Sequence, residues 1–161
     1  MNPPSFVLSE EGAFNDSFEW RLKEQEIRFR GSGAYANLVH RRIPASDEQI
    51  RAFTEALRLL EVWEWRNDYS PEDAGWMVDD GSAWKFEAEI NGRICRCGGA
   101  NAYPAYSSPL TTSMNRERFS MLEAALYDAF SIEGYIHQAK LFAEREATNA
   151  SADEKGTSKR Q

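Results

Sequence analysis

The two cysteines, Cys95 and Cys97, are the residues best suited to metal or redox chemistry, and they lie two positions apart. On an extended strand this spacing puts both thiols on one face. A tetrahedral zinc site would need two further Cys or His ligands, and the chain supplies only His40 and His137. Adjacent cysteines on one strand face seldom suit a disulfide. We therefore expect both thiols to be small core side chains, and we predict no metal ion or other cofactor.

Other catalytic patterns are weak. The stretch GSGAYA (31–36) matches a dinucleotide-binding turn, but the preceding EIRFR alternates with charges, whereas the first strand of such a domain is nearly all apolar. Asp79-Asp80-Gly81 is more typical of a turn than of an acid–base pair. His40 could act as a base, but no nucleophile accompanies it. Since the sequence has no serine-hydrolase elbow, phosphate loop or H-E-x-x-H motif, it favours a protein that is not an enzyme.

The segment 61–80 is both acidic and aromatic. Its seven carboxylates against the single Arg66 give a net charge of −6, most of the −7 of the whole chain. Interface centres favour Trp and Tyr, and a charged rim steers a partner of opposite sign. The alternative is that Trp63 and Trp65 pack the end of a helix against a sheet. The predicted partner-binding residues are Tyr69, Glu72, Asp73, Trp76, Asp79 and Asp80.

These residues lead to a first functional hypothesis and two alternatives. The first is a non-enzymatic module that recognises a basic protein surface, as a neutraliser or adaptor for a toxin or phage component would. The second is a small-ligand-binding protein or small enzyme with a pocket near Trp84, Asn101 and Tyr103, since Asn101 and Tyr103 bring hydrogen-bonding groups. The third is a structural protein of a phage or scaffold.

Four arginines form a separate basic group: Arg28, Arg30, Arg41 and Arg42. They could face phosphate if the first strands lie side by side. A solvated sheet face is the more common fate of such residues in an acidic protein. Contact with the acidic segment is a further possibility.

Composition narrows the class of protein. A sequence pI near 5.0 argues against nucleic acid or anionic membrane as a partner. The chain starts with neither a basic stretch nor a long apolar run, so we expect a cytoplasmic protein. Its 161 residues and 42% hydrophobic content suit one domain, predicted for residues 1–147. Residues 148–161 have no apolar side chain larger than alanine and are predicted to be a disordered tail.

The elements that position these residues follow from periodicity. Alternation over 18–30 predicts two strands, and 34–43 is taken as a third. Ser46 and Gln49 form a capping box that begins a helix over 47–62. Asn91-Gly92 is a type I′ turn signal; it predicts a hairpin with Ala88 opposite Cys95, Phe86 opposite Cys97, and Gly98 and Gly99 opposite Lys85 and Trp84.

Two further helices are expected, over 115–131 and, after an interruption at Gly134, over 135–147. Apolar stripes on the 47–62 and 115–131 helices require a sheet to cover. The predicted fold class is therefore α+β, a two-layer sandwich in which an antiparallel sheet of about five strands carries two main helices on one face.

One part of the sequence resembles a family. The run VWEWRNDY, then DDGSAWKF and GGANAYP, resembles a group of small uncharacterised bacterial proteins with the pattern W-x-W, Y, D-G-x-x-W and G-x-N-A-Y-P. The similarity covers roughly residues 42–127. No established activity is associated with the group, so the resemblance implies a fold and no catalytic residues. The matching residues are Trp63, Trp65, Tyr69, Asp80, Gly81, Trp84, Gly99, Asn101, Ala102, Tyr103 and Pro104.

Overall fold

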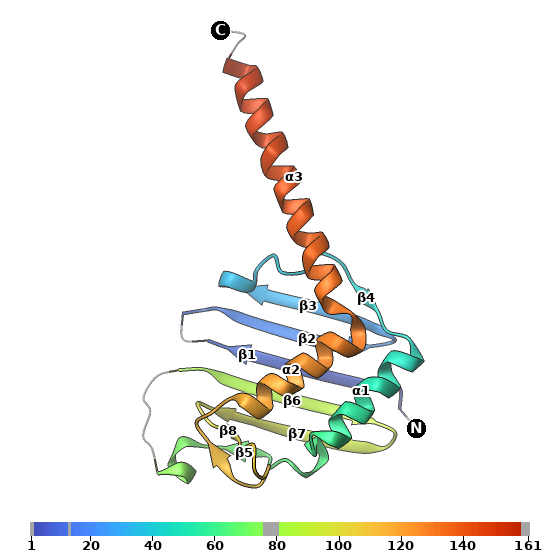
Figure 1. The fold of residues 1–161 in the computed structure, drawn as a ribbon, viewed down its shortest axis with the longest axis vertical. Coiled ribbons are helices and arrows are strands. Elements are labelled where there is room, and N and C mark those ends of the chain that lie inside the picture. Colours follow the sequence, from blue (N-terminus) through green and yellow to red (C-terminus); the bar gives the residue numbers. More distant parts are fainter. Residues whose placement is uncertain (1, 13, 76–80, 159–161) are drawn as a thin grey trace.

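The computed structural model describes residues 2–12, 14–75 and 81–158, and in them the chain forms an α+β fold (Figure 1). The main sheet has the strand order β4-β3-β2-β1-β6-β7-β5, and β8 pairs with β9 beside it. The strands are β1 (Ser5–Glu11), β2 (Ser17–Lys23), β3 (Glu26–Ser32), β4 (Ile43–Pro44), β5 (Asp68–Tyr69), β6 (Ala83–Ile90), β7 (Arg93–Ala100), β8 (Tyr103–Pro104) and β9 (Thr112–Ser113). The helices are α1 (Asp47–Leu59), α2 (Glu117–Phe130) and α3 (Ile132–Ser158), with 3₁₀ turns η1 (Gly33–Tyr35), η2 (Val62–Glu64) and η3 (Pro71–Ala74).

The fold class is as predicted, and the sheet is larger and mixed. Its five long strands, β3, β2, β1, β6 and β7, pair antiparallel. Two strands of two residues each extend the edges in the described ranges: β4 pairs antiparallel with β3, and β5 pairs parallel with β7. The pair is parallel because the chain enters β5 from the end of the sheet where β7 begins: η2 lies there, and its Val62 carbonyl accepts from the Cys95 thiol at 3.5 Å.

The sequence did not predict β1, which lies in the middle of the sheet between β2 and β6. Phe6 pairs with Leu22 on one side and with Ala88 on the other. The Phe6 and Leu8 side chains are buried, while their neighbours Val7 and Ser9 are half-buried on the opposite face. The segment therefore has the alternation of a strand.

The prediction of a third strand over 34–43 was wrong. Gly33 has φ +61° and begins η1. Tyr35, Leu38 and Val39, spaced as on a helical turn, then pack against the core. The Tyr35 ring meets Phe18 edge-on at 5.2 Å. Only Ile43–Pro44 is extended, as β4.

The hairpin of β6 and β7 has the predicted register. Ala88 lies opposite Cys95, Phe86 opposite Cys97 and Trp84 opposite Gly99. The turn residues Asn91 and Gly92 have φ values of 54° and 78°, as a type I′ turn requires. The side chains of Trp84, Phe86, Ala88, Ile90, Cys95 and Cys97 are buried on one face, also as predicted.

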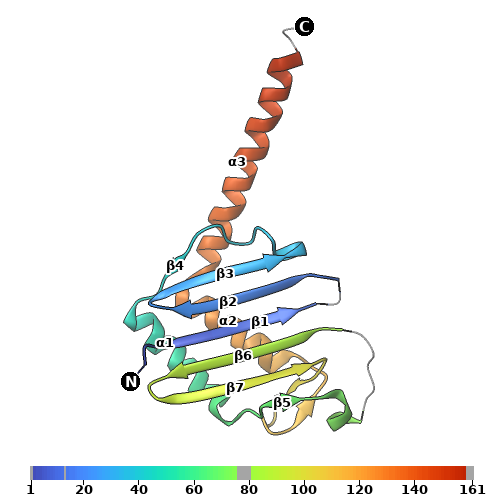
Figure 2. The same cartoon turned by 180° about the vertical axis from the view of Figure 1, so that it is seen from behind.

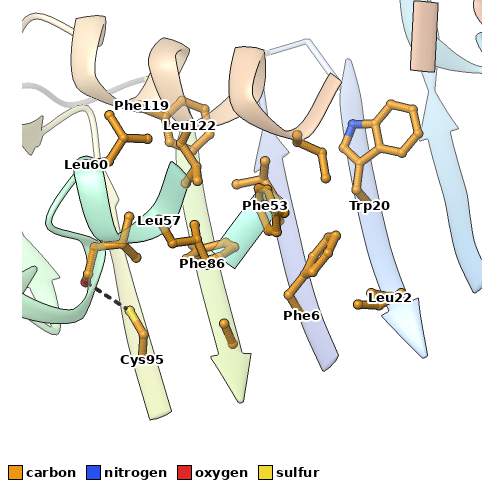
Figure 3. Close-up of a cluster of buried hydrophobic side chains, with 14 of the residues drawn as sticks. Phe6, Trp20, Leu22, Phe53, Leu57, Leu60, Phe86, Cys95, Phe119 and Leu122 are labelled. Carbon is orange, nitrogen blue, oxygen red and sulfur yellow. Dashed lines mark hydrogen bonds between the residues drawn. The ribbon is translucent and has the colours of Figure 1, made fainter. Parts of the chain in front are cut away.

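Helices α1 and α2 cover one face of the sheet (Figure 1). The capping box is present, with Ser46 accepting from the Gln49 amide at 3.1 Å and Gln49 accepting from the Ser46 amide at 3.0 Å. The helix ends at Leu59, three residues before the predicted end, and Glu61 is left-handed. The core lies between the helices and the sheet, where Phe6 faces Phe53 (Figure 3). The Phe6 ring is 4.9 Å from that of Phe53 and 6.1 Å from that of Phe130.

The other face of the sheet carries no helix in the described part of the chain, as the view from behind shows (Figure 2). This face bears the alternate, mainly polar side chains of the long strands. Among them Arg21, Arg28, Lys85 and Arg96 are exposed.

Helix α3 begins at a break different from the predicted one. Ser131 has φ 53° and separates α2 from α3, while Gly134 lies inside the first turns of α3. The helix projects away from the sheet (Figures 1 and 2), and residues 140–156 are exposed. Residues 148–158, for which composition predicted disorder, continue this helix. Alanine and glutamate favour propagation of a helix that has already started. None of the described helices is long and apolar enough to cross a bilayer.

Candidate functional site

The acidic segment runs along the β7 edge of the sheet. It leaves α1 through η2, forms β5 and continues into η3, so the described part of the segment lies at this edge (Figure 1). In β5, Asp68 pairs with Gly98 and Tyr69 with Gly99. The Gly98 amide also donates to the Asn67 carbonyl at 3.1 Å. These bonds fix the segment on the sheet.

Tyr69 anchors the segment from inside the protein. Its side chain is only 1% exposed. The hydroxyl accepts a hydrogen bond from the Arg66 amide at 2.9 Å and donates one to the Pro109 carbonyl. Burial raises the pKa of Tyr69 to about 12. Because its ring lies in the core, Tyr69 exposes almost no surface for the predicted contact with a partner.

The tryptophans of the segment also have packing roles. Trp65 is buried, donates its indole N–H to the Leu60 carbonyl at 3.1 Å, and meets Trp84 edge-on at 6.0 Å. Trp63 is half-buried, with the Arg93 guanidinium 5.3 Å from its ring centroid. Trp63 and Trp65 therefore pack the end of α1 against the sheet, which is the alternative given for them above.

The carboxylates, by contrast, face solvent. Glu64, Asp68, Glu72 and Asp73 are all exposed. Asp73 forms an ion pair with Arg66 at 3.2 Å, and the Glu72 carboxylate accepts a hydrogen bond from the Ser70 hydroxyl. Within the described ranges, Glu64, Asp68 and Glu72 have no cation within ion-pairing distance. The predicted site residues Trp76, Asp79 and Asp80 lie outside the described residues.

Two arginines that the sequence did not single out hold this edge together. Arg66 places its guanidinium 5.6 Å from the Tyr69 ring and donates to the Thr112 hydroxyl at 3.1 Å. Arg118, on α2, is 9% exposed and donates to the carbonyls of Leu60 and Ala105 at 2.9 Å each and to that of Tyr106. The position of Arg118 in the sequence could have indicated its burial, because Arg118 lies one turn before Leu122 on the apolar side of α2.

The second predicted site, Trp84, Asn101 and Tyr103, is brought together by the fold, but its polar groups have partners. The Trp84 indole donates to the Ala102 carbonyl at 2.7 Å, and its ring stacks on Tyr103 at 6.0 Å. The Tyr103 hydroxyl lies 3.2 Å from the Ser82 hydroxyl. Asn101, with φ 54°, accepts from the Ser82 amide at 2.9 Å. Trp84 and Tyr103 are buried, so this cluster mainly fixes the turn after β7.

A small hollow of about 230 Å³ lies between the acidic segment and that turn. Asp68, Ser70 and Glu72 line it on one side, and Ala100 and Asn101 line it on the other. The Trp84 and Tyr103 side chains do not line it. The hollow is smaller than a typical drug-sized site. Its two carboxylates make it chemically suited to one long cationic side chain, because they can accept hydrogen bonds from an ammonium or guanidinium group.

The cysteines lie in the core, as expected. Their sulfur atoms are 3.7 Å apart. The Cys95 thiol donates to the Val62 carbonyl at 3.5 Å (Figure 3), and the Cys97 thiol to that of Phe86 at 3.5 Å. The hydrogen bond between the sulfurs, together with burial, raises the pKa of Cys97. In the part of the chain that the structure describes, no three His, Cys, Asp or Glu residues are placed to hold a metal ion.

Comparison with family models, curated proteins and solved structures finds no match to this chain. The resemblance to the bacterial group therefore stays a prediction.

Proposed function

We propose that this chain is a non-enzymatic binding protein that captures a basic protein surface with its acidic edge, defined as the exposed carboxylates Glu64, Asp68, Glu72 and Asp73 around β5 and η3. The observation that carries the proposal is the hollow between Asp68, Glu72 and Asn101. Its carboxylates have no cation of the described chain beside them, and its size suits one lysine or arginine of a partner.

The charge of the edge supports rapid association. Carboxylates gathered at one edge create a local negative potential that steers a cationic partner. The edge is also held rigidly, because Tyr69 and Trp65 are buried beneath it and β5 is bonded to β7. A surface that needs little ordering loses less conformational entropy when it binds.

The alternatives have weaker support. A small-ligand site at Trp84, Asn101 and Tyr103 would need side chains free to contact the ligand, whereas Trp84 and Tyr103 are buried and hydrogen-bonded. A structural role in a phage or scaffold stays a hypothesis that no feature of the fold favours.

The test compares three forms of the full chain as baits for proteins of its source cells. One is unchanged, one carries Asp68→Asn and Glu72→Gln, and a control carries Glu144→Gln and Glu146→Gln on the exposed part of α3. Both variants change the net charge equally. We expect at least one protein to be retained by the unchanged chain and the control and lost from the D68N/E72Q variant.

The association rate of that purified partner then tests the mechanism. At low salt, about 50 mM, the D68N/E72Q variant should associate about tenfold more slowly than the control. The difference should shrink at about 300 mM salt because surface charges are screened. Equal rates for the two variants at low salt would reject the acidic edge as the binding surface.

A further inference from the structure

A second hollow, of about 500 Å³, lies at the opposite edge of the sheet, between β3 and the loop that follows η1. Its lining gathers the basic group noted in the sequence and adds two members from neighbouring positions. These residues form what we name the basic hollow: Arg21, Arg28, Arg30, His40, Arg41 and Arg42. All six are exposed.

The topology explains why these residues meet. Arg21 on β2 lies directly opposite Arg28 on β3, and Arg30 points to the same face two residues further along. Arg41 and Arg42 come from the loop that enters β4, whose pairing with β3 involves only Glu26 and Ile27. The loop therefore passes the outer edge of β3 and brings its side chains to the arginines of the sheet.

The arrangement is unfavourable for the protein by itself. Like charges directly opposite each other on neighbouring strands destabilise a sheet, and Arg21 and Arg28 are such a pair. Glu19, which also lines the hollow, offsets Arg21 at 2.6 Å, and Glu26 lies 3.7 Å from Arg28 and 3.6 Å from Arg42. These two glutamates leave three of the five arginine charges unbalanced.

Arg30 and Arg41 carry most of this excess. Across the described ranges, neither has a carboxylate within ion-pairing distance. The loop that holds Arg41 is fixed from outside, because the His40 ring stacks on Phe142 of α3 at 5.1 Å with an angle of 18° between the planes. The basic hollow is therefore a positive site in a protein whose formal net charge is −7.

We propose that the basic hollow binds a small organic ligand carrying two or more phosphate groups. Guanidinium groups bind phosphate oxygens in pairs of parallel hydrogen bonds. The volume falls within the range of small-molecule sites, and Phe29 and Val39 add apolar lining for the organic part. A long polyanion is disfavoured, because a chain with a formal net charge of −7 has little overall attraction for it.

The proposal does not depend on the acidic edge, which lies beyond β7 at the other side of the sheet. Its test is calorimetric titration of the full chain with inorganic triphosphate as the probe. The main variant is Arg30→Gln with Arg41→Gln. The matched control is Arg51→Gln with Arg145→Gln, which removes two exposed arginines from α1 and α3.

We expect the unchanged chain to bind triphosphate, R30Q/R41Q to bind at least about tenfold more weakly, and the control to stay within about twofold. Arg30→Lys with Arg41→Lys should lose less affinity than R30Q/R41Q, because lysine keeps the positive charge but lacks the paired N–H groups of a guanidinium. Circular dichroism verifies that each variant folds; should R30Q/R41Q not fold, Arg41→Gln alone, in a loop, must still weaken binding.

Three results would overturn the proposal. The first is no binding of triphosphate by the unchanged chain. The second is an equal loss in the control, which would indicate attraction by charge alone. The third is tighter binding of a polyglutamate peptide or a single-stranded oligonucleotide than of triphosphate, which would assign the hollow to a polymer.

Discussion

At the scale of single residues, Tyr69 connects the acidic edge to the core. Its ring is buried under β5, and its hydroxyl joins the Arg66 amide to the Pro109 carbonyl. The hydroxyl is therefore a donor that must stay protonated in the folded protein. Its pKa is raised to about 12 because burial disfavours the phenolate.

This shift predicts a loss of stability in alkali. The unfolded chain ionises Tyr69 near pH 10, its ordinary pKa, and the folded chain near 12. The stabilising contribution is complete below pH 10 and is lost as the pH rises through this window. Between about pH 9 and about pH 11, Tyr69 should lower the free energy of unfolding by about 1 kcal/mol.

Urea unfolding of the unchanged chain and of Tyr69→Phe at both pH values measures this contribution. The variant is expected to be about 1–2 kcal/mol less stable at pH 9, because the Pro109 carbonyl and the Arg66 amide lose their partner. It should then lose about 1 kcal/mol less than the unchanged chain on going to pH 11. Tyr127, whose pKa burial also raises to about 12, contributes equally to both proteins. Parallel losses in the two proteins would contradict the assignment to Tyr69.

The sequence could show that Tyr69 belongs to an acidic, aromatic segment, but not that its ring points inward. Its hydroxyl partner, Pro109, comes 40 residues later, and no local pattern connects the two. The packing of Trp63 and Trp65 was easier to predict, because both residues directly follow an amphipathic helix whose end must pack against the sheet.

At the scale of elements, the glycines after β7 have a steric role. Gly99 lies opposite Trp84, as the predicted register of the hairpin requires. A Cβ atom on Gly99 would lie 2.5 Å from the Ala102 carbonyl oxygen, 2.8 Å from that of Tyr69 and 3.0 Å from the Trp84 indole nitrogen. The missing side chain lets the turn after β7, the parallel strand β5 and the indole approach one another.

Gly99→Ala should therefore lower the free energy of unfolding by about 2–3 kcal/mol, because backbone atoms must move to admit the methyl group. Gly134→Ala is the matched control, since nothing lies within 4 Å of that Cβ position. The control should gain about 0.5–1 kcal/mol, as alanine favours a helix over glycine. Urea unfolding of the two variants gives both values, and a stable G99A protein would refute the steric explanation.

Local signals decided which elements could be predicted. Asn91-Gly92 fixed the hairpin and its register, and Ser46 with Gln49 fixed the start of α1. The loop over 34–43 was predicted as a strand, but it begins with the turn η1, and Tyr35, Leu38 and Val39 reach the core from this loop and not from a sheet. Strand β5 has two residues and pairs with a strand 30 residues later, so no periodicity could show it.

At the scale of the molecule, charge is separated along the sheet. The acidic edge lies beyond β7, and the basic hollow lies at β3 and β4, the other end of the strand order. Both groups of charges could be identified from the sequence, but whether they contact each other could not be predicted from it. The strand order answers that question, because the acidic segment joins one edge while the arginines stay at the other.

The far part of α3 is expected to add nothing to the stability of the rest. Residues 143–156 are exposed, whereas Phe142, just before them, stacks on His40 of the loop that enters β4. A chain ending at Ala147 should unfold at the same urea concentration as the full chain, within about 0.5 kcal/mol. A chain ending at Lys140 lacks Phe142 and should be less stable, so it serves as the contrasting variant. A clear loss on removing only residues 148–161 would show that the far part of α3 is bound within the fold.

The central place of β1 has a consequence for how the chain is made. As the protein emerges from the ribosome, the first three strands can form a meander at once, but the neighbour of β1 on its other side, β6, is synthesised only after α1 and the acidic segment. Until then one side of β1 has no strand to bond, and the apolar rings that α2 will cover stay uncovered until α2 has been made after β7. The nascent protein therefore passes through a stage at which the backbone N–H and C=O groups along one side of β1 are unpaired and need protection by chaperones.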